Sequence, residues 1–327
     1  MSSVPEDLDA LLALVADTTA PEDLRMRGVS ALGTMVGKQV DGRSTLALVD
    51  CVMTDMHPNV VIAAVGVLGR IKAYSGVPVL IDVVLGTQTA LYEGPDAKAF
   101  IASDDSLRLR CAAVQALGRM MDERAIIPLM SILNDKSLNY RLRLAAAESL
   151  GKLGDGHAVT PLIDILADDR EKSLYLKESA AKALGMLGDI RAVEPLIDIL
   201  ESKKGFRDKF NFLKEQVIEA IARIGRPHRK ATDSLVEALQ DEAPSIRLAA
   251  VEALEAIGET DCVQHLLPMV SDNNDDVARA AISALYELGG EQALQAIMAQ
   301  DNLPQFLRSE IMDYLEGSGD DDELPDD

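Results

Sequence analysis

The segment "LKESAAKALGMLGDIRAVEPLIDIL" (176–200) decides the fold, because it contains one complete transition between two helices. Its first half places Ala and Leu at helical spacing and ends at Gly-Asp, a pair that suits a left-handed helix C-terminus. Its second half starts a new apolar helix with Pro195 near the beginning, where the early N–H groups lack intrahelical partners. The segment therefore predicts two helices joined by a short turn.

The same pattern recurs along the chain. Each copy is centred on one apolar residue of the Ala- and Leu-rich helix, such as Leu184 in the segment above. The centres are 31 to 49 residues apart: Leu32, Leu68, Leu117, Leu150, Leu184, Ile221, Leu254 and Leu285. Self-similarity at this period is typical of a stacked solenoid, in which each helix pair is too small to bury its own apolar face. We therefore expect one all-α domain over residues 1–316 and a disordered acidic tail over residues 317–327.

A family resemblance follows from the repeated phrase "R-x-x-A-A-x-A-L-G-x-L-G-D-x-x-A-V-x-P-L-I-x-I-L". The phrase resembles the short HEAT-like repeat of phycobilisome bilin-lyase subunits, over about residues 8–300. The resemblance implies a right-handed α-solenoid of about eight HEAT-like helix pairs. We expect terminal capping helices near residues 5–16 and 302–317, and small residues that let neighbouring helices approach closely.

Charge and cysteine content narrow the function classes. The formal net charge is -22, with 32 Lys and Arg against 54 Asp and Glu, which disfavours general nucleic-acid binding and attachment to anionic membranes. No apolar run approaches the length of a membrane span, and the N-terminus is acidic where a signal peptide is basic. Cys51, Cys111 and Cys262 are too few and too far apart for a disulfide framework or a thiolate zinc site, so we expect a cytoplasmic protein.

A column of cations lies seven residues before the centres of most repeats. It contains Arg25, Arg110, Arg143, Lys177, Lys214 and Arg247, whereas Val61 and Ala278 interrupt it. Acids such as Asp135, Asp168, Asp241 and Asp272 lie in the preceding loops. In HEAT-like proteins such columns commonly brace successive repeats, so the resemblance implies a structural ladder. A ligand-binding stripe is the alternative.

The two longest insertions that interrupt the regular spacing lie over residues 86–106 and 201–214, and a shorter one lies over residues 167–174. The second, "ESKKGFRDKFNFLK", lies in a region (201–232) with nine Lys and Arg against four acids, inside an otherwise acidic chain. One interpretation is that its Phe side chains pack the loop onto the solenoid, with Phe212 capping the core. The other is a docking site for an acidic or amphipathic protein, and its expected partner-binding residues are Lys203, Lys204, Phe206, Arg207, Lys209, Phe210, Arg226, Arg229 and Lys230. The acidic tail could fold back onto the same residues.

Motifs for catalysis and metal binding are missing from the sequence. It has no HExxH, no His-Glu dipeptide of the hydroxylase type, no GxxxxGK[ST] and no GxGxxG. We therefore expect no catalytic residues, metal or cofactor. The sequence favours a non-enzymatic scaffold or adaptor that binds a protein through its concave face and loop edge. The alternative is a bilin-lyase-like enzyme or chaperone that handles a tetrapyrrole.

Overall fold

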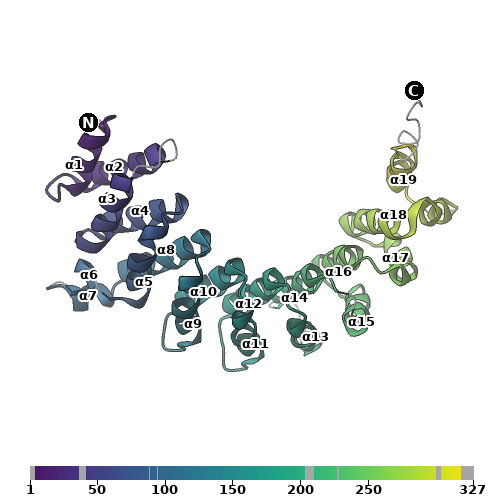
Figure 1. Ribbon diagram of the computed structural model, residues 1–327. Coiled ribbons are helices and arrows are strands. Elements are labelled where there is room, and N and C mark those ends of the chain that lie inside the picture. The colour runs from purple at the N-terminus through teal and green to yellow at the C-terminus, as the bar shows by residue number, and fades with distance from the viewer. Residues whose placement is uncertain are drawn as a thin grey trace. The chain divides into compact units, whose positions relative to one another are not determined.

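Each repeat folds as a first helix and a second helix joined by a loop (Figure 1). The computed structural model describes residues 4–36, 42–87, 89–93, 95–202, 210–226, 228–299 and 303–317. Within these ranges every regular element is helical, which confirms the all-α prediction.

The helices form two sets along the chain. The first helices are α1 (Leu8–Ala16), α3 (Gly42–Thr54), α5 (Val77–Leu85), α9 (Ile126–Asn134), α11 (Val159–Ala167), α13 (Val193–Ser202), α15 (Arg229–Ala238) and α17 (Val263–Leu266), the last continued by the 3-10 helix η6 (Leu267–Ser271). The second helices are α2 (Glu22–Val36), α4 (Pro58–Arg70), α8 (Asp104–Met120), α10 (Tyr140–Leu153), α12 (Leu174–Leu187), α14 (Asn211–Ile224), α16 (Pro244–Ile257) and α18 (Asp275–Met298). Short 3-10 helices precede five of the first helices: η1 (Tyr74–Gly76), η2 (Glu123–Ala125), η3 (Gly156–Ala158), η4 (Ile190–Ala192) and η5 (Thr260–Cys262).

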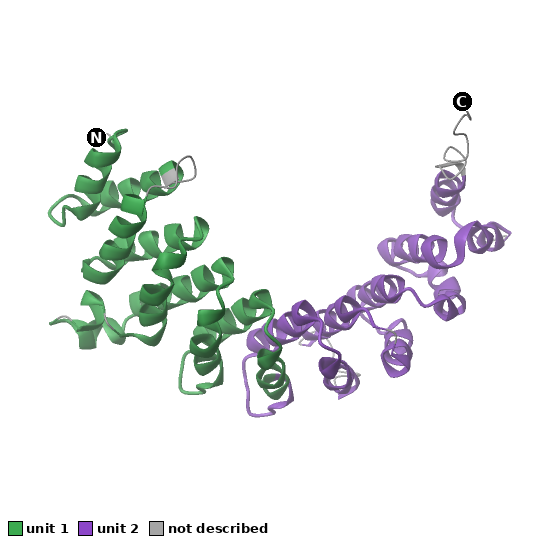
Figure 2. Cartoon of the chain, in the orientation of Figure 1, with its two compact units in different colours: residues 1–165 green, residues 166–327 purple. Residues whose placement is uncertain are grey.

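The chain divides into two compact units, residues 1–165 and 166–327 (Figure 2), with the boundary inside α11. In unit 1 the second helices α2, α4, α8 and α10 pack in sequence, and in unit 2 α12, α14, α16 and α18 do the same. One domain over residues 1–316 stays a prediction. Most of the expected tail, residues 318–327, lies outside the described residues.

The core follows the column of repeat centres. All eight centres lie in second helices, and none is more than 3% exposed. Each centre therefore contacts the first helix of its own pair or the adjacent second helix, and stacking rather than any single pair completes the core. The repeat pattern predicted this arrangement correctly.

Glycine after the centre sets how closely second helices approach. A Cβ built on Gly69 of α4 would lie 2.6 Å from Cβ of Ala116 on α8, and one on Gly185 of α12 would lie 2.8 Å from Cα of Ala220 on α14. Such distances leave no room for a side chain. This confirms the prediction that small residues allow close helix approach.

The ends of the second helices carry local signals. In α12, the Ser173 side chain accepts a hydrogen bond from the Leu176 backbone N–H (3.2 Å), and the helix ends at Gly188 with φ of +65°. Glycine adopts this left-handed conformation without a steric penalty. α8 ends differently, at Met121 with φ of +56°, because no glycine follows it.

The first insertion folds back on unit 1. It forms two short helices, α6 (Ala90–Glu93) and α7 (Ala97–Ile101), between α5 and α8. Leu91 and Tyr92 are buried, and the Tyr92 ring meets the Phe100 ring edge-on with centroids 5.2 Å apart. α7 therefore ends beside the N-terminus of α8.

Both ends of the chain are covered by helices, as predicted. α1 packs on α2, and α19 (Gln305–Gly317) packs on α18. The Tyr286 and Tyr314 rings lie 5.1 Å apart between α18 and α19. The terminal helices thus cover apolar side chains of α2 and α18.

One stretch, Tyr74–Glu93, has the length and mean hydropathy of a membrane-spanning helix, which the sequence analysis overlooked. In the structure this stretch contains η1, α5 and α6, and α5 ends at Gly86 in a left-handed conformation. Val77, Val79, Leu80, Val83 and Val84 are buried, and α5 packs on α8. The apolar residues thus serve as core.

Candidate functional site

The cations of the predicted ladder share one contact. Each of the first four cations lies on a second helix and donates a hydrogen bond to a backbone carbonyl near the C-terminal end of the first helix of the same pair. The bonds are Arg25 Nη2 to Val15 O (2.8 Å), Arg110 Nε to Val84 O (2.9 Å), Arg143 Nε to Leu133 O (3.0 Å) and Lys177 Nζ to Leu166 O (3.0 Å). Carbonyls at a helix C-terminus lack intrahelical partners, so these cations satisfy them.

Three ladder cations also bind an Asp from the loop of the next repeat. Arg25 pairs with Asp55, and both side chains are at most 2% exposed. Lys214 Nζ lies 2.8 Å from Asp241, and Arg247 binds both carboxylate oxygens of Asp272 at 2.7 and 2.6 Å. These contacts join consecutive helix pairs; the bracing role stays a prediction that stability measurements can test.

The aspartates respond to these contacts. Burial acts to raise the pKa of Asp55, but the hydrogen bonds from Arg25 and from the His57 backbone N–H outweigh it, and the pKa falls below its ordinary value. The hydrogen bonds from Arg247 lower the pKa of Asp272 in the same way, against a smaller effect of burial. Both carboxylates are therefore ionised at neutral pH.

Arg110 is the exception in the column. Its Nε donates to Val84 O, but within the described ranges its guanidinium forms no ion pair with Asp135, the acid of the following loop. Asp135 Oδ1 instead accepts hydrogen bonds from the Ser137 N–H (2.9 Å) and hydroxyl (2.6 Å). Burial lowers the pKa of Arg110. Sequence alone gave no reason to separate Arg110 from its column.

The residues expected to bind a partner are not gathered at one place. Lys203, Lys204, Phe206, Arg207 and Lys209 lie outside the described residues. Phe210 immediately precedes α14, whereas Arg226, Arg229 and Lys230 follow its C-terminal end, about 20 Å away along a helix of 14 residues. Arg226 and Arg229 are exposed, and Lys230 Nζ is 3.1 Å from Glu194 on α13. The structure thus separates Phe210 from these three cations.

Phe212 does not cap the core, contrary to expectation, because it is 70% exposed near the start of α14. Tyr175, at the equivalent position of α12, is 66% exposed. Both lie nine residues before the centre of their repeat, so the alignment of the repeats could have revealed the pair. α12 and α14 pack together, and packed helices have axes about 8–10 Å apart. The two aromatic side chains therefore belong to one surface.

Carboxylates follow the aromatic pair on the same helices. Glu178 and Glu215 each lie one turn beyond Tyr175 and Phe212, and both are half-buried. Burial raises the pKa of Glu178, and the negative charge of Glu215 adds to the effect. Among the described residues neither carboxylate has an ion-pair partner. We call Tyr175, Phe212, Glu178 and Glu215 the α12–α14 face.

In unit 1 the corresponding positions are different. The carboxylate positions are occupied by half-buried apolar side chains and one thiol: Met26, Ile62, Cys111 and Leu144. The aromatic positions are occupied by Asp23, Asn59, Arg108 and Arg141. On these columns, therefore, the four second helices of unit 1 carry neither an aromatic side chain nor a half-buried carboxylate at the positions that Tyr175 and Glu178 occupy in α12.

Cysteine and histidine show no organised chemistry in the described ranges. Burial raises the pKa of the Cys51 thiol to about 12 and also raises that of Cys111, so both are protonated at neutral pH. The imidazoles of His57 and His157 each lie beside one carboxylate, Asp55 (3.1 Å) and Asp155 (2.7 Å). No group of three His, Cys, Asp or Glu side chains with metal-binding geometry occurs in this part of the chain.

Family models and solved structures match this architecture. A model of HEAT repeats matches residues 95–174, 136–210 and 204–286, and a model of the PBS lyase HEAT-like repeat matches residues 277–299. A search of curated proteins by sequence found no match.

Three solved structures illustrate the similarity. The complex of CpcE and CpcF of phycocyanin lyase from Nostoc is 25% identical, with a TM-score of 0.42 over 66% of this chain and 91% of that chain. A Kap121p mutant is 14% identical, with a TM-score of 0.53 over 93% of this chain and 39% of that chain. Kap95p, in a structure with RanGDP, is 11% identical, with a TM-score of 0.51 over 95% of this chain and 51% of that chain. The two karyopherins are much longer chains, and their similarity shows the solenoid fold alone.

Proposed function

Because the chain belongs to the HEAT-repeat family, we propose that it is a non-enzymatic scaffold or adaptor that binds a protein partner on its second helices. Stacked helix pairs create extended surfaces whose exposed side chains are free to vary while the core is kept. The fold alone supports many functions, so the argument rests on the α12–α14 face.

The observation that carries the proposal is the exposure of Tyr175 (66%) and Phe212 (70%) on neighbouring helices. Aromatic side chains supply a large share of the binding energy at protein interfaces. Two such side chains at equivalent positions of packed helices would anchor one segment of a partner. Neither contributes its ring to the core, so both rings are available to contact another molecule.

The charges on the same face specify the chemistry of the partner. Glu178 and Glu215 raise the free energy of the folded chain when both are ionised, because their charges repel. A Lys or Arg side chain from the partner would relieve this repulsion. We therefore infer an amphipathic partner segment, with apolar side chains for Tyr175 and Phe212 and basic side chains for the carboxylates.

Docking of an acidic or amphipathic partner through residues 203–210 stays a separate proposal, based on the cations of that stretch of sequence. The tetrapyrrole-handling alternative also remains open to test, and visible absorbance of the expressed protein would support it. A cytoplasmic location belongs to the same set of proposals, and the free cysteines Cys51, Cys111 and Cys262 are in keeping with it.

A binding comparison tests the proposal. Wild type, Tyr175→Ala/Phe212→Ala, Phe206→Ala/Arg207→Glu/Lys209→Glu and Ile127→Ala would be used as bait in the native lysate. Ile127, on α9, is 80% exposed and serves as the matched control. The segment of any recovered protein that contacts the bait would be mapped, synthesised and titrated against each variant.

We expect the synthetic segment to be amphipathic and basic. The aromatic double variant should bind it about tenfold or more weakly than the wild type does. Ile127→Ala should leave its Kd unchanged. Loss of affinity in the 206/207/209 variant alone would move the site to the insertion. Equal affinity for all four proteins would refute both docking sites.

A further inference from the structure

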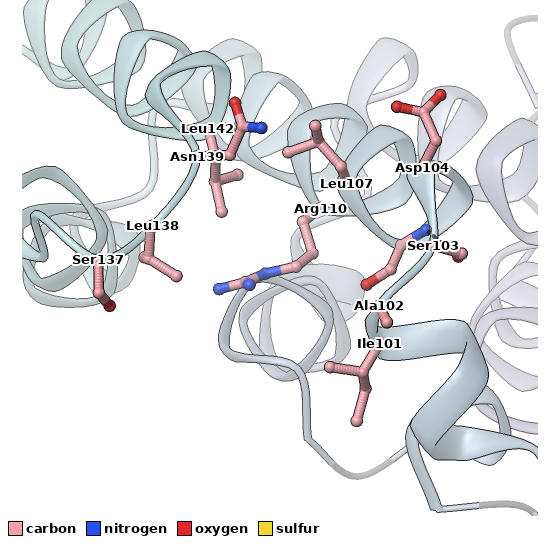
Figure 3. Close-up of a pocket in the computed structure, with 11 residues that line it drawn as sticks. Ile101, Ala102, Ser103, Asp104, Leu107, Arg110, Ser137, Leu138, Asn139 and Leu142 are labelled. Carbon is pink, nitrogen blue, oxygen red and sulfur yellow. Dashed lines mark hydrogen bonds between the residues drawn. The ribbon is translucent and has the colours of Figure 1, made fainter.

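The Arg110 step of the ladder opens onto a pocket of about 370 Å³ in unit 1. Its walls come from the end of α7, the first turns of α8 and the loop before α10 (Figure 3). The Arg110 side chain extends from α8 into the space beside Leu138. We propose that this pocket binds a carboxylate group carried on a short aliphatic stem, with Arg110 as the anchor.

The charge of the pocket supports an anionic ligand. Arg110 is half-buried, and Nε is the only guanidinium nitrogen with a hydrogen bond to the described residues. Burial lowers the pKa of Arg110, which means that its charge lacks full compensation by the surroundings. Asp104 also lines the pocket, but its carboxylate points away from the guanidinium in Figure 3. An anion that reached the two terminal nitrogens would supply the missing compensation.

The other ladder steps indicate which anion fits. At Asp55 and Asp241, one carboxylate oxygen accepts a backbone N–H of its own loop and the other binds the ladder cation. At Asp272, Oδ1 accepts such an N–H and both oxygens bind Arg247. At Asp135 the first contact is present, through Ser137, but the second is not. The chain thus places a carboxylate against this column at three other steps. Arg110 has the same guanidinium donors as Arg25 and Arg247, but it receives no carboxylate from the loop that contains Asp135.

The remaining lining selects for an apolar stem. Leu107, Leu138, Leu142 and Ile101 line the pocket, so methylene groups next to the carboxylate would be covered. The hydroxyl of Ser103 donates to Phe100 O, and that of Ser137 donates to Asp135. Asn139 uses its amide oxygen to cap α10, which leaves its NH2 group as a second donor. One guanidinium, one amide and apolar walls suit a Glu side chain or a small aliphatic acid.

The first insertion explains why this step is open. The centres Leu68 and Leu117 are 49 residues apart, the longest spacing in the chain, and the added residues form α6 and α7. α7 ends at Ile101, which contributes one wall of the pocket. The insertion has therefore turned a structural position of the repeat into a lined cavity.

Titration by NMR tests this inference on the full chain, with the methyl groups of Leu138 and Leu142 as reporters. Glutarate and an acetylated peptide containing Glu represent the two sources of the carboxylate, and inorganic phosphate is the competing anion. We expect saturable shifts with glutarate or the peptide, and the tighter of the two identifies the source. Absence of shifts with both probes, or tighter binding of phosphate, would refute the carboxylate assignment.

Variants separate anchoring from general charge. Arg110→Gln should weaken binding of the probe about tenfold or more. Arg108→Gln on the same helix should leave the affinity unchanged, because Arg108 is 52% exposed and pairs with Asp105. Leu138→Glu, compared with Leu138→Gln, supplies a carboxylate within the chain. It should abolish probe binding and raise Tm relative to Leu138→Gln. An unchanged affinity for the probe in both Arg110→Gln and Leu138→Glu would overturn the proposal. Tyr175→Ala/Phe212→Ala should leave the affinity for the probe unchanged.

Discussion

Lys214 and Phe212 lie two residues apart on α14, and the structure gives them opposite environments. Lys214 is 3% exposed and binds Asp241, whereas Phe212 is 70% exposed. Lys177 and Tyr175 repeat the contrast on α12, at 7% and 66%. Two residues advance a helix by about 200°, so the side chains point to opposite sides. One helix thus presents a buried ladder cation on one side and an exposed aromatic side chain on the other.

Arg110 lies between these two cases. By its position in the repeat Arg110 belongs to the structural ladder. Like Arg25 and Arg143, it donates a hydrogen bond to a backbone carbonyl near the C-terminal end of its first helix. It also lines a pocket, whereas Arg25, Lys214 and Arg247 each bind an Asp carboxylate. Position in the repeat therefore predicts a role only while the spacing of the repeats is regular.

The largest expected effect is on the structural ladder, at its most buried ion pair, Arg25–Asp55. Arg25→Ala should lower the free energy of unfolding by about 3–5 kcal/mol, because it leaves the Asp55 carboxylate buried without its partner. Chemical unfolding followed by circular dichroism measures the change. Arg25→Ala/Asp55→Ala should recover part of the loss. A loss below about 1 kcal/mol in the single variant would show that this pair does not brace the repeats.

The next largest expected effect is a loss of stability at acidic pH, through the aspartates that pair with the ladder cations. The folded-state pKa values of Asp55 and Asp272 are lowered by their cationic partners, so their stabilising contribution is complete above the unfolded pKa of about 3.9. It is lost as the pH falls through the lowered folded values. We expect Tm to fall below about pH 4, and to fall less steeply in Asp272→Asn. Parallel profiles for the two proteins would contradict the linkage.

A matched pair on α14 sharpens the comparison. Lys214→Ala should lower the free energy of unfolding by about 1–3 kcal/mol, because the hydrogen bond to Asp241 is lost. Phe212→Ala should change it by less than about 0.5 kcal/mol, because the ring is exposed. Unfolding of both variants in urea gives the two values under identical conditions. Equal losses would mean that Phe212 contributes to packing after all.

The smallest expected effect has the opposite sign. Burial and the charge of Glu215 raise the folded-state pKa of Glu178, so its ionised form destabilises the chain and stability increases as the pH falls through that value. Glu178→Gln should therefore raise the free energy of unfolding at pH 7 by less than about 0.5 kcal/mol, given the solvent screening at this half-buried site. A clear decrease would indicate that Glu178 has a stabilising partner.

The repeat pattern predicted much of the fold because local signals determine it. The buried centres, the helix ends at glycine such as Gly188, and the close approach at Gly185 all follow from residues within one repeat. The inward position of Lys214 was also predictable, since it shares a column with other cations. Each of these features depends on short-range spacing rather than on the conformation of an insertion.

The functional surfaces were harder to predict. One interpretation of the sequence has Phe212 capping the core, and only its register shows that it points outward with Tyr175. The open step at Arg110 depends on how α6 and α7 fold back, which residue spacing does not specify. The exposed aromatic side chains and the Arg110 pocket are thus departures from the repeat, whereas the repeat itself specifies the core.

Site-specific photo-cross-linking measures whether the α12–α14 face contacts a protein partner, as we propose. A photoreactive phenylalanine analogue would replace Phe212 in one sample and Ile127, 80% exposed on α9, in the other. The account predicts one amphipathic, basic segment cross-linked at position 212 and not at 127, with its yield reduced by Tyr175→Ala. The same products at both positions, or none at 212, would contradict it.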